Sequence, residues 1–142
     1  MAQSDVPAEK IAAFMKTNYI VLTEQQDFTL RIGNRSPALS ALYKKTNTTW
    51  SAFITAYNPL SSLQDHDTNE AANKRLFDKL SPLYRHVFQG NGADPKGLWP
   101  PEPSFFVLGI DLVPAKLLGE QFRQDAIIWV DSDAIPQLIL LR

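Results

Sequence analysis

The chain has 142 residues, of which 14 are lysine or arginine and 15 are aspartate or glutamate, giving a net charge of -1 at pH 7. This length is typical of one domain and allows a core to form without a metal or a disulfide. The sequence contains no cysteine, which excludes disulfides, thiolate metal ligands and cysteine nucleophiles. We therefore expect a single domain over residues 1–142.

The sequence shows no sign of membrane insertion or secretion. The first residues include Asp5 and Glu9 and have no long apolar run, unlike a secretion signal. No stretch approaches the roughly 20 apolar residues of a membrane span. By elimination we expect a cytoplasmic protein. The balanced charge disfavours nucleic acid as a partner, because general nucleic-acid binders carry a basic excess. A local basic patch would still allow nucleic acid as a partner. Its residues would be Lys74, Arg75, Lys79 and Arg85.

The first half of the chain predicts two helices, a hairpin and a strand. Residues 7–19 have apolar side chains at helical spacing, and residues 19–22 and 28–32 read as two strands of a hairpin. Ser36 and Pro37 are a typical cap and first residue of a second helix. Residues 50–57 are rich in aromatic and β-branched side chains, which predicts a central strand ending at Asn58-Pro59.

The second half predicts a helix over residues 68–80, capped by Thr68, and a strand over residues 84–89. Residues 90–103 are rich in glycine and proline and read as a long loop. An apolar strand over residues 105–110 and a helix opening at Asp111 and Pro114 follow. Residues 126–130 and 136–141 read as a terminal hairpin.

From residue 50 onward the predicted order is β-α-β-β-α-β-β, which matches a ferredoxin-like split βαβ core with an added C-terminal hairpin strand. We therefore expect an α+β domain. Its antiparallel sheet carries helices on one face and is preceded by the N-terminal helix and hairpin. The apolar strand over residues 137–141 could also pair with a second copy, which makes a homodimer one expected assembly.

The standard catalytic signatures are absent from the sequence. It has no GxxxxGK[ST] phosphate loop, no HExxH and no GxSxG elbow. Its two histidines, His66 and His86, are too far apart to form a short helical metal pair. We predict no metal site, although a magnesium site built from carboxylates alone stays open. The sequence does not identify a cofactor or decide whether the chain is an enzyme.

Two asparagines on the helix over residues 68–80 are the most informative polar residues. At 3.6 residues per turn, Asn69 and Asn73 fall on the same face as Leu76 and Leu80. A buried amide without a hydrogen bond costs about 1–3 kcal/mol. Their partners must therefore come from the protein, from water or from a ligand.

Further polar candidates lie near the predicted ends of strands. Asn58 and Ser61 precede the asparagine-bearing helix, whose N-terminus suits an anion. Trp99 could stack on a flat group, and Glu102, held between prolines, could act as a general acid or base. Gln124 ends a helix next to a buried strand. Each of these residues also has a purely structural explanation. Asn58 can end a strand and Ser61 can form a turn. Trp99 can pack against the rim, Glu102 can cap backbone amides, and Gln124 can be a polar residue at a helix end.

Three motifs carry a family resemblance: ITAYNP at residues 54–59, LWPPEPSF at residues 98–105, and FRQDAIIW at residues 122–129. Together with Asn69 and Asn73, they resemble the bacterial family known as domain of unknown function 3293. The resemblance extends from about residue 19 to residue 141. The doubled proline at 100–101 departs from the family pattern and changes the position of Glu102 within the motif. The family implies a small bacterial protein and assigns no reaction, ligand or catalytic residue.

Two functions are compatible with these features. The first is a domain that binds a small polar ligand, such as a nucleotide or another anion, with Glu102 as the candidate catalytic group. Its ligand-binding residues would be Asn58, Ser61, Asn69, Asn73, Trp99 and Gln124. The alternative is a non-enzymatic module that binds protein or RNA, since a fold of this kind does not fix the function.

Overall fold

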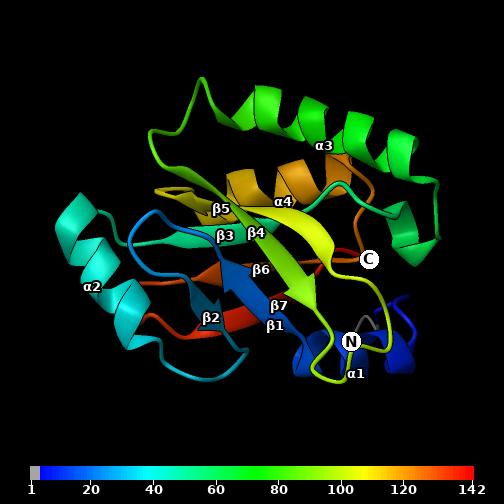
Figure 1. Cartoon of the computed structure of the whole chain (residues 1–142), viewed down its shortest axis with the longest axis horizontal. Coiled ribbons are helices and arrows are strands. Elements are labelled where there is room, and N and C mark those ends of the chain that lie inside the picture. Colours follow the sequence, from blue (N-terminus) through cyan, green and yellow to red (C-terminus); the bar gives the residue numbers. More distant parts are fainter. Residues whose placement is uncertain (1–3) are drawn as a thin grey trace.

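The computed structural model describes residues 4–142 (Figure 1). Four helices, one short 3-10 helix and seven strands are formed within that range. The helices are α1 (Ala8–Lys16), α2 (Pro37–Thr46), η1 (Pro59–Ser61), α3 (His66–Leu80) and α4 (Leu112–Gln121). The strands are β1 (Asn18–Val21), β2 (Phe28–Leu30), β3 (Ser51–Ile54), β4 (Val87–Ala93), β5 (Glu102–Leu108), β6 (Ala126–Val130) and β7 (Pro136–Leu140).

The seven strands form one antiparallel sheet in the order β2-β1-β4-β5-β3-β6-β7. The predicted hairpins are confirmed: β1 pairs with β2, and β6 pairs with β7. The predicted central strand β3 lies between β5 and β6. The sheet curls, so that one of its faces is concave (Figure 1). β7 lies at an edge, and its pairing with a second copy stays a prediction.

Helices pack on both faces of the sheet, so the expectation of helices on one face was wrong. Ala52 and Ile54 of β3 belong to the core under α3 and α4. Phe53, between them in sequence, belongs to a second core with Leu39 and Tyr43 of α2. Successive side chains of a strand point to opposite faces, which separates these two cores. The apolar stripe of α2 indicated that this helix is packed but not which face it covers.

The helix starts follow local capping. Ser36 caps α2 as predicted, with its hydroxyl accepting a hydrogen bond from the Leu39 N–H at 3.1 Å. The prediction of Thr68 as the cap of α3 was wrong. Asp65 is the cap, and its carboxylate accepts a hydrogen bond from the Thr68 N–H at 2.7 Å. Aspartate is as good a cap as threonine, so the helix begins two residues earlier.

The predicted loop over residues 90–103 is shorter than expected and covers residues 94–101, because both of its ends are strand. β4 continues through Gly90 and Gly92, and β5 begins at Glu102, which pairs with Gly92. A Cβ atom on Gly90 would lie 2.6 Å from the Ile20 carbonyl oxygen and 2.8 Å from Phe53 Cε2. The glycine therefore allows a close approach on the concave face rather than a flexible loop.

No helix among the described residues is long and apolar enough to cross a membrane.

Candidate functional site

A cleft of about 710 Å³ opens on the concave face of the sheet. Its floor is apolar and includes Phe53 of β3 and Ile128 of β6, and Phe14 of α1 lines it as well. Its polar lining comes from the turn after β3, the start of α3 and the start of β5. Six of the seven residues predicted from the sequence line this cleft: Asn58, Ser61, Asn69, Trp99, Glu102 and Gln124.

The seventh residue, Asn73, is buried but does not line the cleft. Its Oδ1 accepts a hydrogen bond from the Ala56 N–H at 2.8 Å, and its Nδ2 donates to the Pro103 carbonyl at 3.0 Å. The side chain thus ties the end of β3 to the start of β5. The prediction that Asn73 binds a ligand is therefore not supported by its position, because its amide is used by the backbone.

Asn69 also serves the backbone, although it lines the cleft. Its Oδ1 accepts from the Asn58 N–H at 2.9 Å, and its Nδ2 donates to the Asn58 Oδ1 at 2.9 Å. Asn58 has a φ of +47°, a left-handed conformation that asparagine tolerates better than most residues. Asn69 therefore holds both the main chain and the side chain of Asn58 in place.

The fixed side chain of Asn58 presents its amide to Glu102. Its Nδ2 donates to Glu102 Oε2 at 3.1 Å, while its Oδ1 also accepts from the Gln64 N–H at 3.0 Å. Hydrogen-bond networks of this kind set which atoms of an amide point at a neighbour. The turn therefore orients one donor toward the carboxyl group at the start of β5.

Glu102 is half-buried at the edge of the apolar floor. Burial raises its pKa above the ordinary value, and the hydrogen bond from Asn58 and the charge of Lys10 offset this only in part. Within the described residues, the second carboxyl oxygen, Oε1, forms no hydrogen bond. Glu102 thus has one oxygen held by the protein and one open to a ligand.

A second carboxylate lines the cleft and was not predicted. Asp125 is buried and accepts hydrogen bonds from Ser61 Oγ at 2.5 Å and from Arg142 Nε. Burial alone would raise its pKa, but the hydrogen bonds from Arg142 and Ser61 outweigh it and lower the pKa. The predicted Ser61 is thus tied to a partner that sequence spacing of 64 residues could not indicate.

Gln124 and Trp99 complete the predicted set. Gln124 is buried, and its Nε2 donates to the carbonyl oxygens of Tyr57 at 3.1 Å and Phe122 at 3.3 Å. Trp99 is half-buried in the connection between β4 and β5. Both line the cleft as expected, Gln124 mainly as a support for the turn and Trp99 as an aromatic wall.

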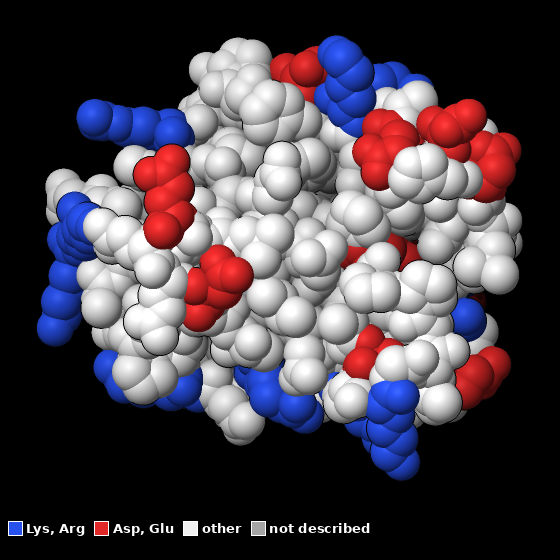
Figure 2. All heavy atoms as spheres, in the orientation of Figure 1, with Lys and Arg blue, Asp and Glu red and all other residues white. Residues whose placement is uncertain are grey.

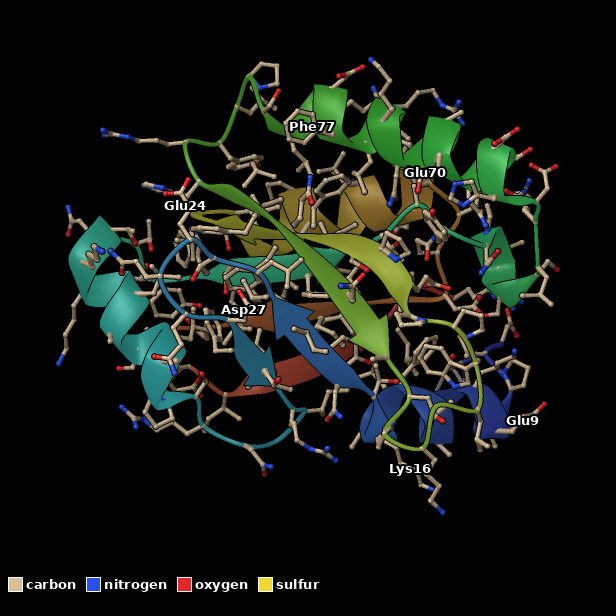
Figure 3. All side chains as sticks on the ribbon, viewed as in Figure 1. Glu9, Lys16, Glu24, Asp27, Glu70 and Phe77 are labelled. Atoms are coloured by element: carbon tan, nitrogen blue, oxygen red, sulfur yellow. The ribbon has the colours of Figure 1, made fainter. Side chains whose placement is uncertain are left out.

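The start of α3 adds a polar pair that the sequence did not reveal. Tyr57, at the start of the turn that contains Asn58-Pro59, donates its hydroxyl to Glu70 Oε1 at 2.5 Å. Burial and the neighbouring Glu70 raise the pKa of Tyr57 to about 12. Glu70 projects from the N-terminal part of α3 (Figure 3). The tyrosine was visible in the motif, but its partner lies 13 residues away on the next element.

The electrostatics of the cleft are acidic. Three carboxylates line it, from Glu70, Glu102 and Asp125, against one lysine, Lys10. Acidic side chains also gather over the N-terminal end of α3, at the upper right of Figure 2. Asp65 caps that helix at the Thr68 N–H and adds a further negative charge where an anion would approach. Within residues 4–142, no group of three or more histidine or carboxylate side chains is arranged to hold a metal ion.

Comparison with known proteins supports the family resemblance that the sequence motifs carry. No curated protein and no solved structure matches the chain significantly. The sequence pattern of one family, described as "Protein of unknown function (DUF3293)", matches residues 54–127, from the end of β3 to the start of β6. This segment contains the turn at Asn58, both asparagines of α3, Glu102 and Gln124. The chain belongs to this family.

Proposed function

We propose that the chain binds a small organic molecule in the cleft, and that Glu102 recognises its hydrogen-bond donors. The observation that carries the proposal is a carboxyl group at the edge of an apolar floor, held on one side by Asn58. Ligand sites are commonly apolar clefts of about 300–1,000 Å³ with a few fixed polar groups. The cleft has the volume, the apolar floor and the oriented polar group.

The charges in the cleft favour a neutral or amine-bearing ligand over the anion suggested by the sequence. Oε1 of Glu102 is an acceptor when ionised and can donate only when protonated. With Glu70 also present and Lys10 as the single lysine in the lining, an anion would meet like charge. The ligand class that fits is a compound with an aromatic or aliphatic body and an amine, amide or hydroxyl donor.

Glu102 is also our candidate general acid or base for a bound compound that is turned over. Burial raises its pKa above the ordinary value, which is the direction expected of a carboxyl group that acts as a general acid or base. We assign no catalytic step to a second side chain, because the buried amides of Asn69 and Gln124 hold the turn in place.

The first test is a ligand screen of the wild type, Glu102→Gln and Glu24→Gln by thermal shift. The panel contains aromatic amines and amides together with carboxylates of the same shape. A ligand at 100 times its dissociation constant adds about 2.7 kcal/mol of stability. We expect amine or amide hits that Glu102→Gln weakens and Glu24→Gln does not, because Glu24 lies outside the cleft in the turn between β1 and β2 (Figure 3).

The pH dependence follows from the raised pKa of Glu102. The folded protein holds this proton more tightly than the unfolded chain, whose glutamate has the ordinary value of 4.5. Stability from this group is therefore lost as the pH rises from 4.5 through the folded-state pKa. Glu102→Gln should flatten that slope in urea unfolding, while amine binding to the wild type should tighten over the same window. Parallel slopes in both proteins would contradict the assignment.

A protein- or RNA-binding module remains the alternative, and one observation favours a larger partner. Leu63, at the cleft mouth, is 91% exposed, and Leu98, next to Trp99, is 79% exposed. Apolar side chains as exposed as these two can form a contact surface. Two results together would support this alternative. No compound in the ligand panel would bind, and a soluble partner would protect the backbone amides of these leucines from hydrogen exchange.

We also propose that the segment from β3 to β6 is the ferredoxin-like split βαβ core expected from the sequence. Two observations support it: the strand order β4-β5-β3-β6 within the sheet, and the packing of α3 and α4 in one core on the same face. The N-terminal hairpin and β7 then extend this core at its two edges. An experimental structure tests the assignment.

A further inference from the structure

A second cavity, of about 260 Å³, lies behind the turn that follows β3. Asn58 lines the main cleft, whereas the next residue, Pro59, lines this second cavity. Its other walls come from α3 and from the end of α4, on the face of the sheet away from the cleft. The two cavities thus share the turn but none of their lining residues.

Three of the eight residues that line this second cavity are basic. Arg75 and Lys79 lie one turn apart on α3, and Arg123 follows the end of α4. The lining contains no acidic residue. Within residues 4–142 none of the three side chains forms a salt bridge or a hydrogen bond, while the neighbouring Lys74 is paired with Asp78 at 2.8 Å. Three cations therefore converge on one cavity without a counter-charge from the protein.

The backbone at Arg123 points to a role for its side chain. Arg123 has a φ of +57°, the left-handed region in which a residue with a side chain is strained and glycine is not. The turn holds this conformation through a hydrogen bond from the Leu60 N–H to the Arg123 carbonyl at 2.6 Å. An arginine at a position that favours glycine is the kind of local strain that clusters at binding sites.

We propose that this cavity binds a small oxyanion, the phosphate group of a phosphorylated small molecule. The guanidinium groups of Arg75 and Arg123 can each bind two phosphate oxygens, and Lys79 adds a point charge. The cavity is smaller than the roughly 300–1,000 Å³ of sites for drug-sized ligands, so it suits one phosphate group rather than a whole nucleotide. This site does not depend on the function proposed for the cleft.

The test is an NMR titration of the full chain with inorganic phosphate at low, chloride-matched ionic strength. Phenyl phosphate and a single-stranded oligonucleotide are titrated in parallel to separate the sources of the phosphate group. The variants are Arg75→Gln and Arg123→Gly. Arg85→Gln is the matched control, because it removes the same charge from an exposed residue outside the cavity.

We expect saturable shifts around the cavity with phosphate and tighter binding of phenyl phosphate. Arg75→Gln and Arg123→Gly should each weaken binding at least about tenfold, since each removes a charged hydrogen-bonding group. Arg123→Gly should unfold at the wild-type temperature or above it, which separates lost binding from lost folding. Arg85→Gln should bind as the wild type does.

Three results would overturn the proposal. The first is the absence of saturable binding at millimolar phosphate. The second is an equal loss of affinity in Arg85→Gln, which would show a general charge effect. The third is an oligonucleotide that binds far more tightly than phosphate and is weakened by Arg85→Gln as well. That result would assign the basic surface of α3 to nucleic acid.

Discussion

The buried asparagines of α3 show how much of a residue's burial and hydrogen bonding can be predicted from the sequence. Their burial was predicted from helical spacing and is confirmed, with Asn69 3% exposed and Asn73 5% exposed. The demand for hydrogen-bond partners was also correct. The partners could not be predicted, because Asn73 reaches Ala56, just after β3, and Pro103 of β5, which are 17 and 30 residues away and come together only in the folded sheet.

Asn73→Ala should destabilise the fold without touching the cleft. The substitution leaves the Ala56 N–H buried without an acceptor, which costs about 1–3 kcal/mol. The Pro103 carbonyl loses less, because it still accepts a hydrogen bond from Thr55 Oγ1 at 2.7 Å. Urea unfolding measures the change. Asn34→Ala, at an exposed position, is the control and should stay within about 0.5 kcal/mol of the wild type.

The opposite outcome for Asn73 would also be informative. If Asn73→Ala were as stable as the wild type, the Ala56 N–H would have to reach water or a new acceptor. The asparagine would then be available to a ligand, as the sequence alone suggested.

Among the elements, β4 and β5 are where local sequence rules fail. Glycine and proline usually mark loops, and residues 90–103 were interpreted in that way. Gly90 and Gly92 instead lie within β4, and at Gly90 the neighbouring strands leave no room for a Cβ atom. The two hairpins and the cap of α2 were predicted correctly because their signals are local. The extension of β4 depends on β1 and β5, its neighbours in the sheet.

Alanine substitutions at the two β4 glycines should have opposite effects. At Gly90 the new Cβ would meet the Ile20 carbonyl oxygen at 2.6 Å, so the backbone must shift, at a cost of about 1–3 kcal/mol. At Gly92 the nearest atom is Thr17 Cγ2 at 3.7 Å, an ordinary contact. Gly92→Ala should be neutral or stabilise by up to about 1 kcal/mol, because it restricts the unfolded chain.

Urea unfolding of Gly90→Ala and Gly92→Ala, measured side by side, checks this expectation. Each variant is the control for the other, since both change a glycine of the same strand to alanine. Equal stabilities would show that the curl of the sheet adapts at Gly90 and that the close approach to Ile20 is not needed.

On the scale of the whole molecule, the family segment is not a structural unit by itself. It covers residues 54–127, whereas the concave face is completed by elements outside it. Leu39 and Tyr43 of α2 are buried against that face, and the Tyr43 hydroxyl lies 2.8 Å from Ser51 Oγ and donates to the Val130 carbonyl at 3.0 Å. Local patterns could not predict this, because they show that a helix is amphipathic but not which sheet face it covers.

We therefore expect residues 54–127 expressed alone to lack a stable fold, because Phe106 and Leu108 lose the cover of α2 and most of β3 is missing. Residues 18–142, which omit α1 and the residues on either side of it, should keep cooperative urea unfolding, since no residue of α1 is buried and Val6 and Thr17 are the buried ones among the described residues removed. They should lose cleft ligands, because α1 contributes Lys10 and Phe14 to the wall. Circular dichroism and NMR dispersion check both fragments. A cooperatively folded 54–127 fragment would show that the family segment is the domain and that the remaining elements are additions to it.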